Sequence, residues 1–169
     1  MDLSRPTDDS VNSHIDKEAY SVKYSTIDDA IRLITATGRS CYLAKVDIKH
    51  AFRLVPVRPV DHHLLGFMHN GLYYYDIVLP FGSRSSPKLF CMVSEAIHWI
   101  FTRIIGSDKL IHYMDDFLIV AESREQCAEL LCKFGECVVS WVYRWPMRRQ
   151  WARVHACRFW VLLWIPRVK

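Results

Sequence analysis

The chain has 169 residues, of which 51% are hydrophobic and 13% aromatic. That length and composition suit one domain with a buried core and exclude an intrinsically disordered chain. The net charge is +4, but residues 138–169 carry seven basic and no acidic side chains, so subtracting seven leaves −3 on residues 1–137. The basic total therefore does not by itself indicate a nucleic-acid partner.

Cysteine spacing and apolar runs exclude two further classes. The six cysteines form no C-x-x-C pair, which argues against a zinc site. The longest apolar run of the tail, residues 159–165, is too short to span a bilayer, so we expect no membrane partner. Scattered thiols without a recognisable signal peptide predict an intracellular protein, in the cytoplasm or the nucleus.

The first half of the chain predicts a helix, a strand and a hairpin after an irregular start. A capping residue, helical spacing of apolar residues and a closing glycine predict the helix. An Asn-Gly turn between apolar runs predicts the hairpin. The expected elements are an irregular segment over residues 1–24, a helix from Ser25 or Thr26 to Gly38, a strand over residues 41–47, and hairpin strands over residues 64–67 and 72–79.

The second half predicts a helix, a second hairpin and a last helix. Ser86-Pro87 suits the first turn of a helix, and Ser123 with Gln126 suits a capped helix start. Apolar arms around an acidic pair predict a hairpin with the acids at its turn. The helices are expected from residue 86 to about 105 and from 123 to about 137, with the hairpin over residues 109–121. This order predicts an α/β (α+β) fold, an antiparallel sheet with helices on one face.

Three aspartates, Asp47, Asp115 and Asp116, end or interrupt apolar strands. Like charges held close together in apolar surroundings are costly unless cations compensate them. Mg²⁺ prefers carboxylate and phosphate oxygens, and two such ions about 3.5–4 Å apart can activate a 3′-hydroxyl and stabilise a leaving pyrophosphate. Each acid alone has an ordinary alternative, because a single Asp after a strand and an Asp-Asp pair in a turn are both common. Only the ordered set indicates a metal site.

Three motifs in a fixed order resemble those of reverse transcriptases. AKVDIKHAF at residues 44–52 resembles polymerase motif A, LPFGSRSSPKLF at residues 79–90 resembles motif B, and YMDD at residues 113–116 resembles motif C. The amino-acid sequence of residues 1 to about 137 resembles that of DIRS-type retrotransposons most and that of gypsy-type retrotransposons second. The resemblance implies a polymerase palm with a ferredoxin-like antiparallel sheet, helices on one face, partial fingers and no thumb.

The resemblance implies a role for each acid. Asp47 would bind two Mg²⁺ ions, with Mn²⁺ as an alternative metal, and the backbone carbonyl of Ile48 would bind one of them. Asp115 would complete the metal site. Asp116 would supply supporting charge more than direct ligation.

The resemblance also implies substrate contacts around motif A. Backbone N–H groups of His50 and Ala51 would face the triphosphate. The ring of Phe52 would exclude a 2′-hydroxyl and so select deoxynucleotides, since that hydroxyl distinguishes RNA from DNA building blocks. Without the motif, Phe52 would be an ordinary core phenylalanine.

Motifs B and C would supply further contacts. Phe81 and Gly82 would lie against the incoming nucleotide and the template base, with the glycine allowing close backbone approach. Tyr113 and Met114 would touch the primer end. The plain alternatives are a Pro-x-Gly turn for the first pair and alternating strand residues for the second.

Two other sets of side chains have weaker claims. His62-His63 has no acidic or sulfur ligand at a useful offset, so both are expected to be exposed loop histidines. Lys45, Lys49 and Arg53 could contact nucleic-acid phosphates, or could belong to a solvated face.

The tail after residue 137 has a composition of its own. Five of the six tryptophans lie in residues 141–169, and the tail has no glycine. The family should have there a Gly-Val-Pro turn, a motif D lysine and a Leu-Gly-Ile motif. A permitted choice of codons for residues 139–169, read in another frame, restores the turn and the Leu-Gly-Ile motif. We therefore expect a frameshift-derived tail over residues 138–169, with a basic, Trp-rich surface helix as the alternative. Sequencing the gene separates the two.

The implied activity is RNA-directed DNA synthesis, with a dNTP transferred to a primer 3′-hydroxyl on an RNA template. The chain starts inside the family's fingers and lacks a thumb, so we expect weak or no activity from it. The alternatives are an inactive transposon relic or a nucleic-acid-binding fragment. A different palm enzyme, such as a nucleotide cyclase, is disfavoured by motif B and Phe52. The oligomeric state is left open.

Overall fold

The computed structural model describes residues 3–38, 40–144 and 161–164, with side chains described as far as residue 138. The chain forms two compact units. We call Met1–Lys23 with His50–Val93 the hairpin unit, and Tyr24–Lys49 with Ser94–Lys169 the sheet unit. Helix α2 (Ser86–Ile100) begins in the first unit and ends in the second.

The sheet unit contains a four-stranded antiparallel sheet in the order β4-β5-β1-β6. Strands β1 and β5 are central, so their backbone groups pair on both sides. The antiparallel sheet predicted from the sequence is therefore confirmed. Its strands are β1 (Tyr42–Asp47), β4 (Leu110–Tyr113), β5 (Asp116–Ala121) and, within the tail, β6 (Val161–Trp164).

Helix α1 (Ile27–Thr37) has the capped ends that the sequence predicts. The Thr26 side chain accepts a hydrogen bond from the backbone N–H of Asp29, while the Asp29 carboxylate accepts one from the backbone N–H of Thr26. Gly38 closes the helix with a φ of 116°, in the range where a side chain would be strained. The reciprocal cap fixes where the chain enters the helix.

Helix α3 (Arg124–Arg144) begins as predicted and ends later than predicted. The Ser123 hydroxyl accepts a hydrogen bond from the backbone N–H of Gln126 at 3.1 Å, which caps the start. The expected end near residue 137 is wrong, because the helix continues across that position. No proline or glycine lies between residues 138 and 144, so nothing local stops the helix there.

The face of the sheet beneath α3 carries most of the core. Alternate residues of a strand point to opposite faces, and directly paired residues share a face. Val46 and Ile119 are buried on the same face as Phe117, whose ring centroid lies 5.1 Å from that of Phe134 in α3. The predicted buried character of β1 is thus explained by α3.

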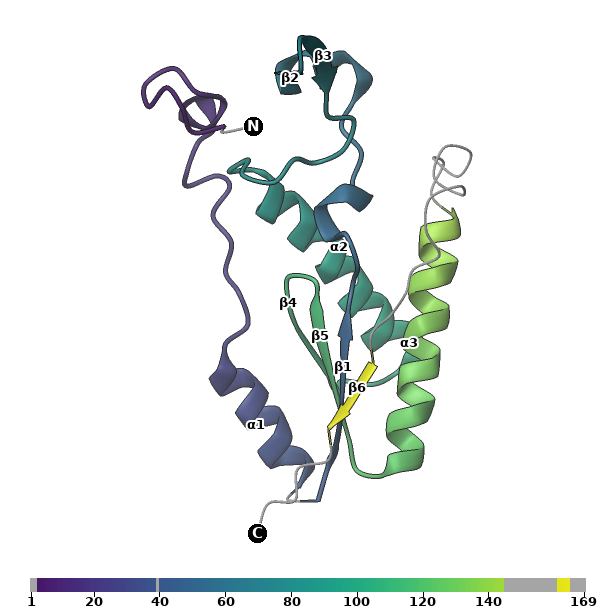
Figure 1. Cartoon of the computed structure of the whole chain (residues 1–169). Coiled ribbons are helices and arrows are strands. Elements are labelled where there is room, and N and C mark those ends of the chain that lie inside the picture. Colours follow the sequence, from purple (N-terminus) through teal and green to yellow (C-terminus); the bar gives the residue numbers. More distant parts are fainter. Residues whose placement is uncertain (1–2, 39, 145–160, 165–169) are drawn as a thin grey trace. The chain divides into compact units, whose positions relative to one another are not determined.

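Helix α1 packs against one end of the opposite face (Figure 1). Leu43 and Val120 are buried there against Leu33 and Ile34 of α1. Toward the other end of the same face the strands carry Lys45, Asp47 and Asp116. The acidic side chains therefore lie at the end of this face away from the α1 contacts.

The hairpin unit contains short helical turns and a two-stranded sheet. The predicted Asn70-Gly71 turn is confirmed, with φ angles of 50° and 75°. The second strand ends at Tyr75 instead of the expected residue 79, because Val78 and Leu79 turn inward and are buried. The elements are η1 (Val11–His14), η2 (Ala51–Leu54), η3 (Pro59–Leu65), β2 (Gly66–His69) and β3 (Leu72–Tyr75).

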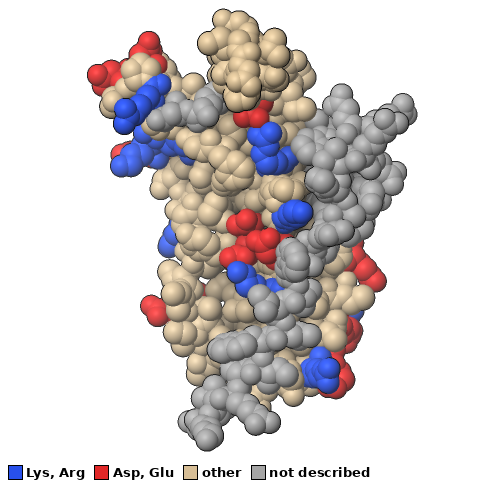
Figure 2. Space-filling view, viewed as in Figure 1, with Lys and Arg blue, Asp and Glu red and all other residues tan. Residues whose placement is uncertain are grey.

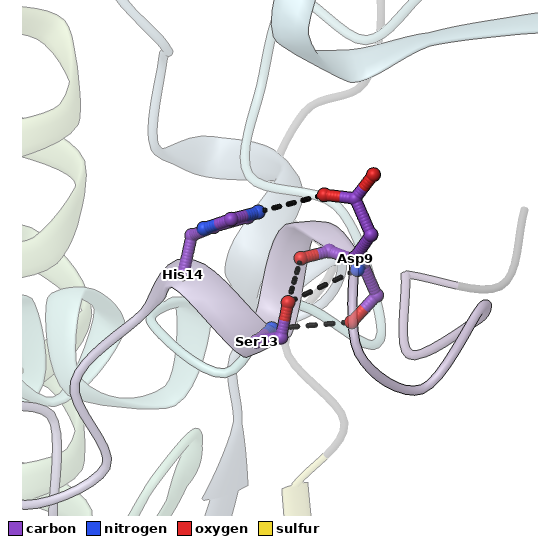
Figure 3. Close-up of polar contacts among 4 residues, drawn as sticks. Asp9, Ser13 and His14 are labelled. Carbon is purple, nitrogen blue, oxygen red and sulfur yellow. Dashed lines mark hydrogen bonds and ion pairs between the residues drawn. The ribbon is translucent and has the colours of Figure 1, made fainter.

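The amino-terminal segment is more ordered than the expected irregular stretch. Ser10 and Ser13 cap η1 reciprocally, through hydrogen bonds between each side chain and the other backbone N–H. Asp9 and His14 close the same turn with a 3.1 Å contact between Oδ1 and Nε2 (Figure 3). The spacing of apolar residues did not predict these contacts, because they are short-range hydrogen bonds between polar groups. Among the described helices, none has both the length and the apolarity needed to cross a bilayer.

Candidate active site

The three aspartates meet at one end of the sheet unit. Asp47 is the last residue of β1 and pairs directly with Asp116, the first residue of β5. Asp115 lies in the two-residue turn between β4 and β5, next to Asp116. The predicted hairpin with its acids at the turn is therefore confirmed, and register brings the separate Asp47 to the same place.

The Met114-Asp115 turn is fixed by two hydrogen bonds from other elements. The Ser94 hydroxyl donates to the carbonyl of Met114 at 2.7 Å, and the backbone N–H of Ile48 donates to the carbonyl of Asp115 at 3.0 Å. Met114 has a φ of 54°, a left-handed conformation that is unfavourable for a side chain of this kind. A conformation of that kind persists only where its surroundings enforce it, as these bonds do.

Burial and neighbouring charges change the pKa of the Asp115 carboxyl in this turn. Burial raises the pKa of the Asp115 carboxyl, and the nearby charges of Asp47 and Asp116 raise it further. A backbone hydrogen bond and the ammonium of Lys45 act in the opposite direction on the same pKa. Lys45 Nζ lies 3.0 Å from Asp116 Oδ1, so one of the three acids already has a cationic partner. Figure 2 shows acidic side chains gathered with basic ones beside them on the face it displays.

The donor chemistry fits a hard divalent cation. Carboxylates of Asp47, Asp115 and Asp116, with the carbonyl of Ile48, are the oxygen ligands that Mg²⁺ and Mn²⁺ prefer. Among the described residues, no group of three or more His, Cys, Asp or Glu side chains is already gathered around a single point. The residue types therefore fit the predicted metal.

Tyr113 pairs with Asp116 and lies on the same face of the sheet as the acids. Its side chain is 52% exposed and its ring centroid lies 4.8 Å from that of Tyr24. A shallow pocket of about 270 Å³ adjoins it, lined among others by Lys45, Asp116 and the start of α1. The predicted primer contact at Tyr113 stays a prediction.

The predicted nucleotide-selecting ring, Phe52, belongs to an aromatic cluster in the hairpin unit. Its centroid lies 5.4 Å from that of Phe81 and 5.6 Å from that of Phe90. Phe90 is fully buried, Phe52 is half-buried and Phe81 is 65% exposed. The cluster thus runs from the core to the surface, and it brings together two residues that the motifs singled out separately.

Backbone conformation explains the other predicted residues of this unit. His50 has a φ of 65° and precedes Ala51, which is buried at the start of η2. Gly82 has a φ of 87°, and a Cβ built there would meet nothing within 4 Å. Its left-handed backbone, and not crowding by described protein atoms, accounts for the glycine.

Asn12 is a site residue that the sequence reasoning missed. Its side chain is buried, and its Nδ2 donates to the carbonyl of Gly82 at 2.8 Å and to the Ser4 hydroxyl at 2.9 Å. Its Oδ1 accepts from the backbone N–H of Arg84 at 2.7 Å. One amide therefore holds the motif B loop from both sides. The partners are 70 and 72 residues away, so no local pattern pointed to them.

The prediction of two exposed loop histidines is wrong for His62. His63 is exposed as expected, but His62 is half-buried in η3, where its ring contacts the carbonyl of Val57 at 3.0 Å and stacks on Tyr75. Arg53 Nη1 lies 2.6 Å from Asp76 Oδ1 in an ion pair, and its contact with nucleic-acid phosphates stays a prediction. The segment with His62 and His63 was expected to be a loop, but it is helical because Pro59 begins a helical turn there.

A histidine pair beneath the sheet was also missed. His98 of α2 and His112 of β4 approach to 3.1 Å between their Nδ1 atoms, and His112 stacks on Phe117. Burial lowers the pKa of both imidazoles, and the charge of His98 lowers that of His112 further while Glu95 opposes the shift. The alternation of β4 could have placed His112 on the buried face, but not opposite His98.

Comparison with known families decides the chain's ancestry. A family model described as reverse transcriptase (RNA-dependent DNA polymerase) matches residues 5–152. The chain belongs to the reverse transcriptase family. The predicted family is therefore confirmed over most of the chain, whereas the subtype and the division at residue 137 stay predictions.

Relatives of the chain are polyproteins of transposons and viruses. The Transposon Tf2-3 polyprotein of Schizosaccharomyces pombe is 31% identical over 99 residues, covering 56% of this chain and 7% of the polyprotein. The Gag-Pol polyprotein of Walleye dermal sarcoma virus is 35% identical over 81 residues, covering 47% of this chain and 4% of the polyprotein. The chain thus spans under a tenth of the length of these relatives.

Solved reverse transcriptases share the fold. The foamy viral protease-reverse transcriptase dRH, solved in complex with double-stranded DNA, has a TM-score of 0.63 at 18% identity, over 78% of this chain and 21% of that one. The foamy viral protease-reverse transcriptase in complex with an RNA/DNA hybrid has a TM-score of 0.51 at 19% identity, over 58% of this chain and 13% of that one. The predicted polymerase fold class is confirmed by this likeness.

Proposed function

We propose that this chain carries the catalytic core of an RNA-directed DNA polymerase of a retroelement, acting inside the cell on an RNA template, a DNA primer and dNTPs. The observation that carries the proposal is the convergence of Asp47, Asp115 and Asp116 at one sheet end. Family membership supports the same chemistry. Two divalent cations, when bound, would activate the primer 3′-hydroxyl and stabilise the leaving pyrophosphate.

The protein's own residues would bind and orient the reactants. Asp47, Asp115 and the Ile48 carbonyl would hold the cations, and Asp116 would add negative charge. Backbone N–H groups of His50 and Ala51 would bind the triphosphate. Positioning and charge are most of what phosphoryl transfer asks of a protein.

The remaining predicted residues would govern selection of the nucleotide and the primer. Phe52 would exclude a 2′-hydroxyl, and Phe81 with Gly82 would contact the nucleotide and the template base. Tyr113 and Met114 would contact the primer end. The aromatic contact between Phe52 and Phe81 supports a shared role for these two rings.

Primer extension on an RNA template, with Mg²⁺ or Mn²⁺, tests the proposal. We expect weak extension that Asp115→Asn reduces by about 10²-fold or more, because a ligand acting in the transition state is lost. Phe52→Ala should retain extension and admit ribonucleotides, while Lys133→Met, which alters a distant ion pair in α3, should leave both unchanged.

The second candidate is an inactive transposon relic. The glycine-free, Trp-rich composition of residues 141–169, where the family should have further motifs, favours it. Metal binding without any extension by the wild-type chain would support the relic. Extension that persists in Asp115→Asn would contradict the proposed site.

A further inference from the structure

Lys45 is a basic residue that the proposed chemistry has not used, although it lies among the acids. It is two residues before Asp47 on β1 and therefore points to the same face of the sheet. Its partner across the ladder is Leu118, and Asp116 lies two residues before Leu118 on β5. The diagonal from Lys45 to Asp116 is within reach of a long side chain.

The side chains use that diagonal. Lys45 Nζ lies 3.0 Å from Asp116 Oδ1, with side-chain exposures of 51% and 44%. An ion pair this exposed contributes little to stability alone, typically about 0–1 kcal/mol. Its effect on the neighbouring charges is larger, because three carboxylates and one ammonium share the end of the sheet.

The ion pair makes the three acids unequal. Asp116 has a cation against one of its oxygens, whereas Asp47, directly opposite, forms no ion pair with the described side chains. A carboxylate oxygen in contact with an ammonium is a poorer ligand for a divalent cation, which would have to displace or repel that ammonium.

We propose that Lys45 is a positioning residue that holds the Asp116 carboxylate against β1 as its counter-ion, so that Asp47 and Asp115 are left to bind a divalent cation. The inference rests on the proposed function. The inference adds Lys45 to the residues of the proposed site. Its ammonium limits how many carboxylates can bind the cation, and a cation that binds Asp116 must compete with the Lys45–Asp116 ion pair.

Mn²⁺ binding, followed through the electron paramagnetic resonance signal of the free ion, tests the inference. Lys45→Met should lower the Kd for Mn²⁺ about three- to tenfold, since a repelling charge is removed and Asp116 is released. Lys45→Arg should restore the wild-type Kd. Lys133→Met removes a lysine from an exposed ion pair with Glu129 in α3 and should leave the Kd unchanged.

An Asp116→Asn background separates positioning from simple repulsion. If Lys45 acts by holding Asp116, Lys45→Met should improve the affinity for Mn²⁺ less in the Asp116→Asn background than in the wild type. The two gains should differ by a factor of at least about three. An equal gain in both backgrounds would overturn the positioning role, as would no gain in the wild type. Wild-type protein that binds no Mn²⁺ would overturn the proposed function and the inference with it, whereas binding without a Lys45 effect would overturn the inference alone.

Discussion

At the scale of single residues, Asp115 shows how a functional charge can oppose stability. Its pKa is raised by burial and by the charges of Asp47 and Asp116, so the folded chain binds this proton more tightly than the unfolded chain does. Stability from this group therefore declines as pH rises from the ordinary pKa of 3.8 through the raised value, and the unfavourable charge is fully present at neutral pH.

Asp115→Asn should therefore stabilise the metal-free protein. We expect Tm at neutral pH, in chelator, to rise by about 1–3 °C, and the gain to shrink as the pH falls through the raised pKa of the carboxyl toward its ordinary 3.8, because the wild-type group then takes up its proton. Differential scanning calorimetry would measure both. Asp108→Asn, at an exposed loop acid, serves as the control. A lower Tm for Asp115→Asn at neutral pH would contradict this reading of the turn.

The His98–His112 pair predicts a second dependence on pH. Burial lowers both pKa values below 6.5, so the unfolded chain binds more protons than the folded chain as pH falls through that value. The stability is fully present above pH 6.5 and is lost on acidification. Between about pH 7.5 and about pH 5 we expect Tm to fall by roughly 2–5 °C more in the wild type than in His112→Asn. His63→Asn, at an exposed histidine, should retain the wild-type slope; an unchanged slope in His112→Asn would rule the pair out as its source.

At the scale of elements, one buried amide connects η1 to the motif B loop. Asn12→Asp replaces a donor facing the carbonyl of Gly82 with an acceptor, so the loop loses a hydrogen bond and gains a repulsion. We expect Tm to fall by about 3–8 °C, and amide hydrogen exchange at residues 81–85 to accelerate. Asp8→Asn, at an exposed position of the same segment, should change neither. Unchanged exchange in the loop would show that Asn12 does not hold it.

Elements were predictable where their signals were local. The ends of α1 at Thr26 and Gly38 were predictable because capping contacts act within four residues. The hairpin was predictable because Asn70-Gly71 favours the positive φ angles of a tight turn. Strand ends in the hairpin unit were not predictable, because the inward turn at Val78 depends on its burial and on its bridge to Pro56. The Lys45–Asp116 and His98–His112 contacts could not be predicted from composition. The first depends on strand register, and the second depends on how α2 packs on the sheet.

At the scale of the whole molecule, three separate motifs identified the family, and the register of β1 against β5 explains why two of them must occur together. Asp47 of motif A and Asp116 of motif C are paired residues of adjacent strands. The frameshift origin of the tail stays a prediction. Within the tail, residues 161–164 form β6 beside β1, an edge position open to any strand-forming segment.

The central claim is that the acidic end of the sheet binds divalent cations for nucleotidyl transfer. A Mn²⁺ titration of the wild-type chain and of Asp47→Asn tests it most directly, because Asp47 is proposed to contact both ions. We predict saturable binding by the wild type and a Kd at least about tenfold weaker in Asp47→Asn, each tenfold corresponding to about 1.4 kcal/mol. Equal affinity in the two proteins, or no binding by either, would contradict the account.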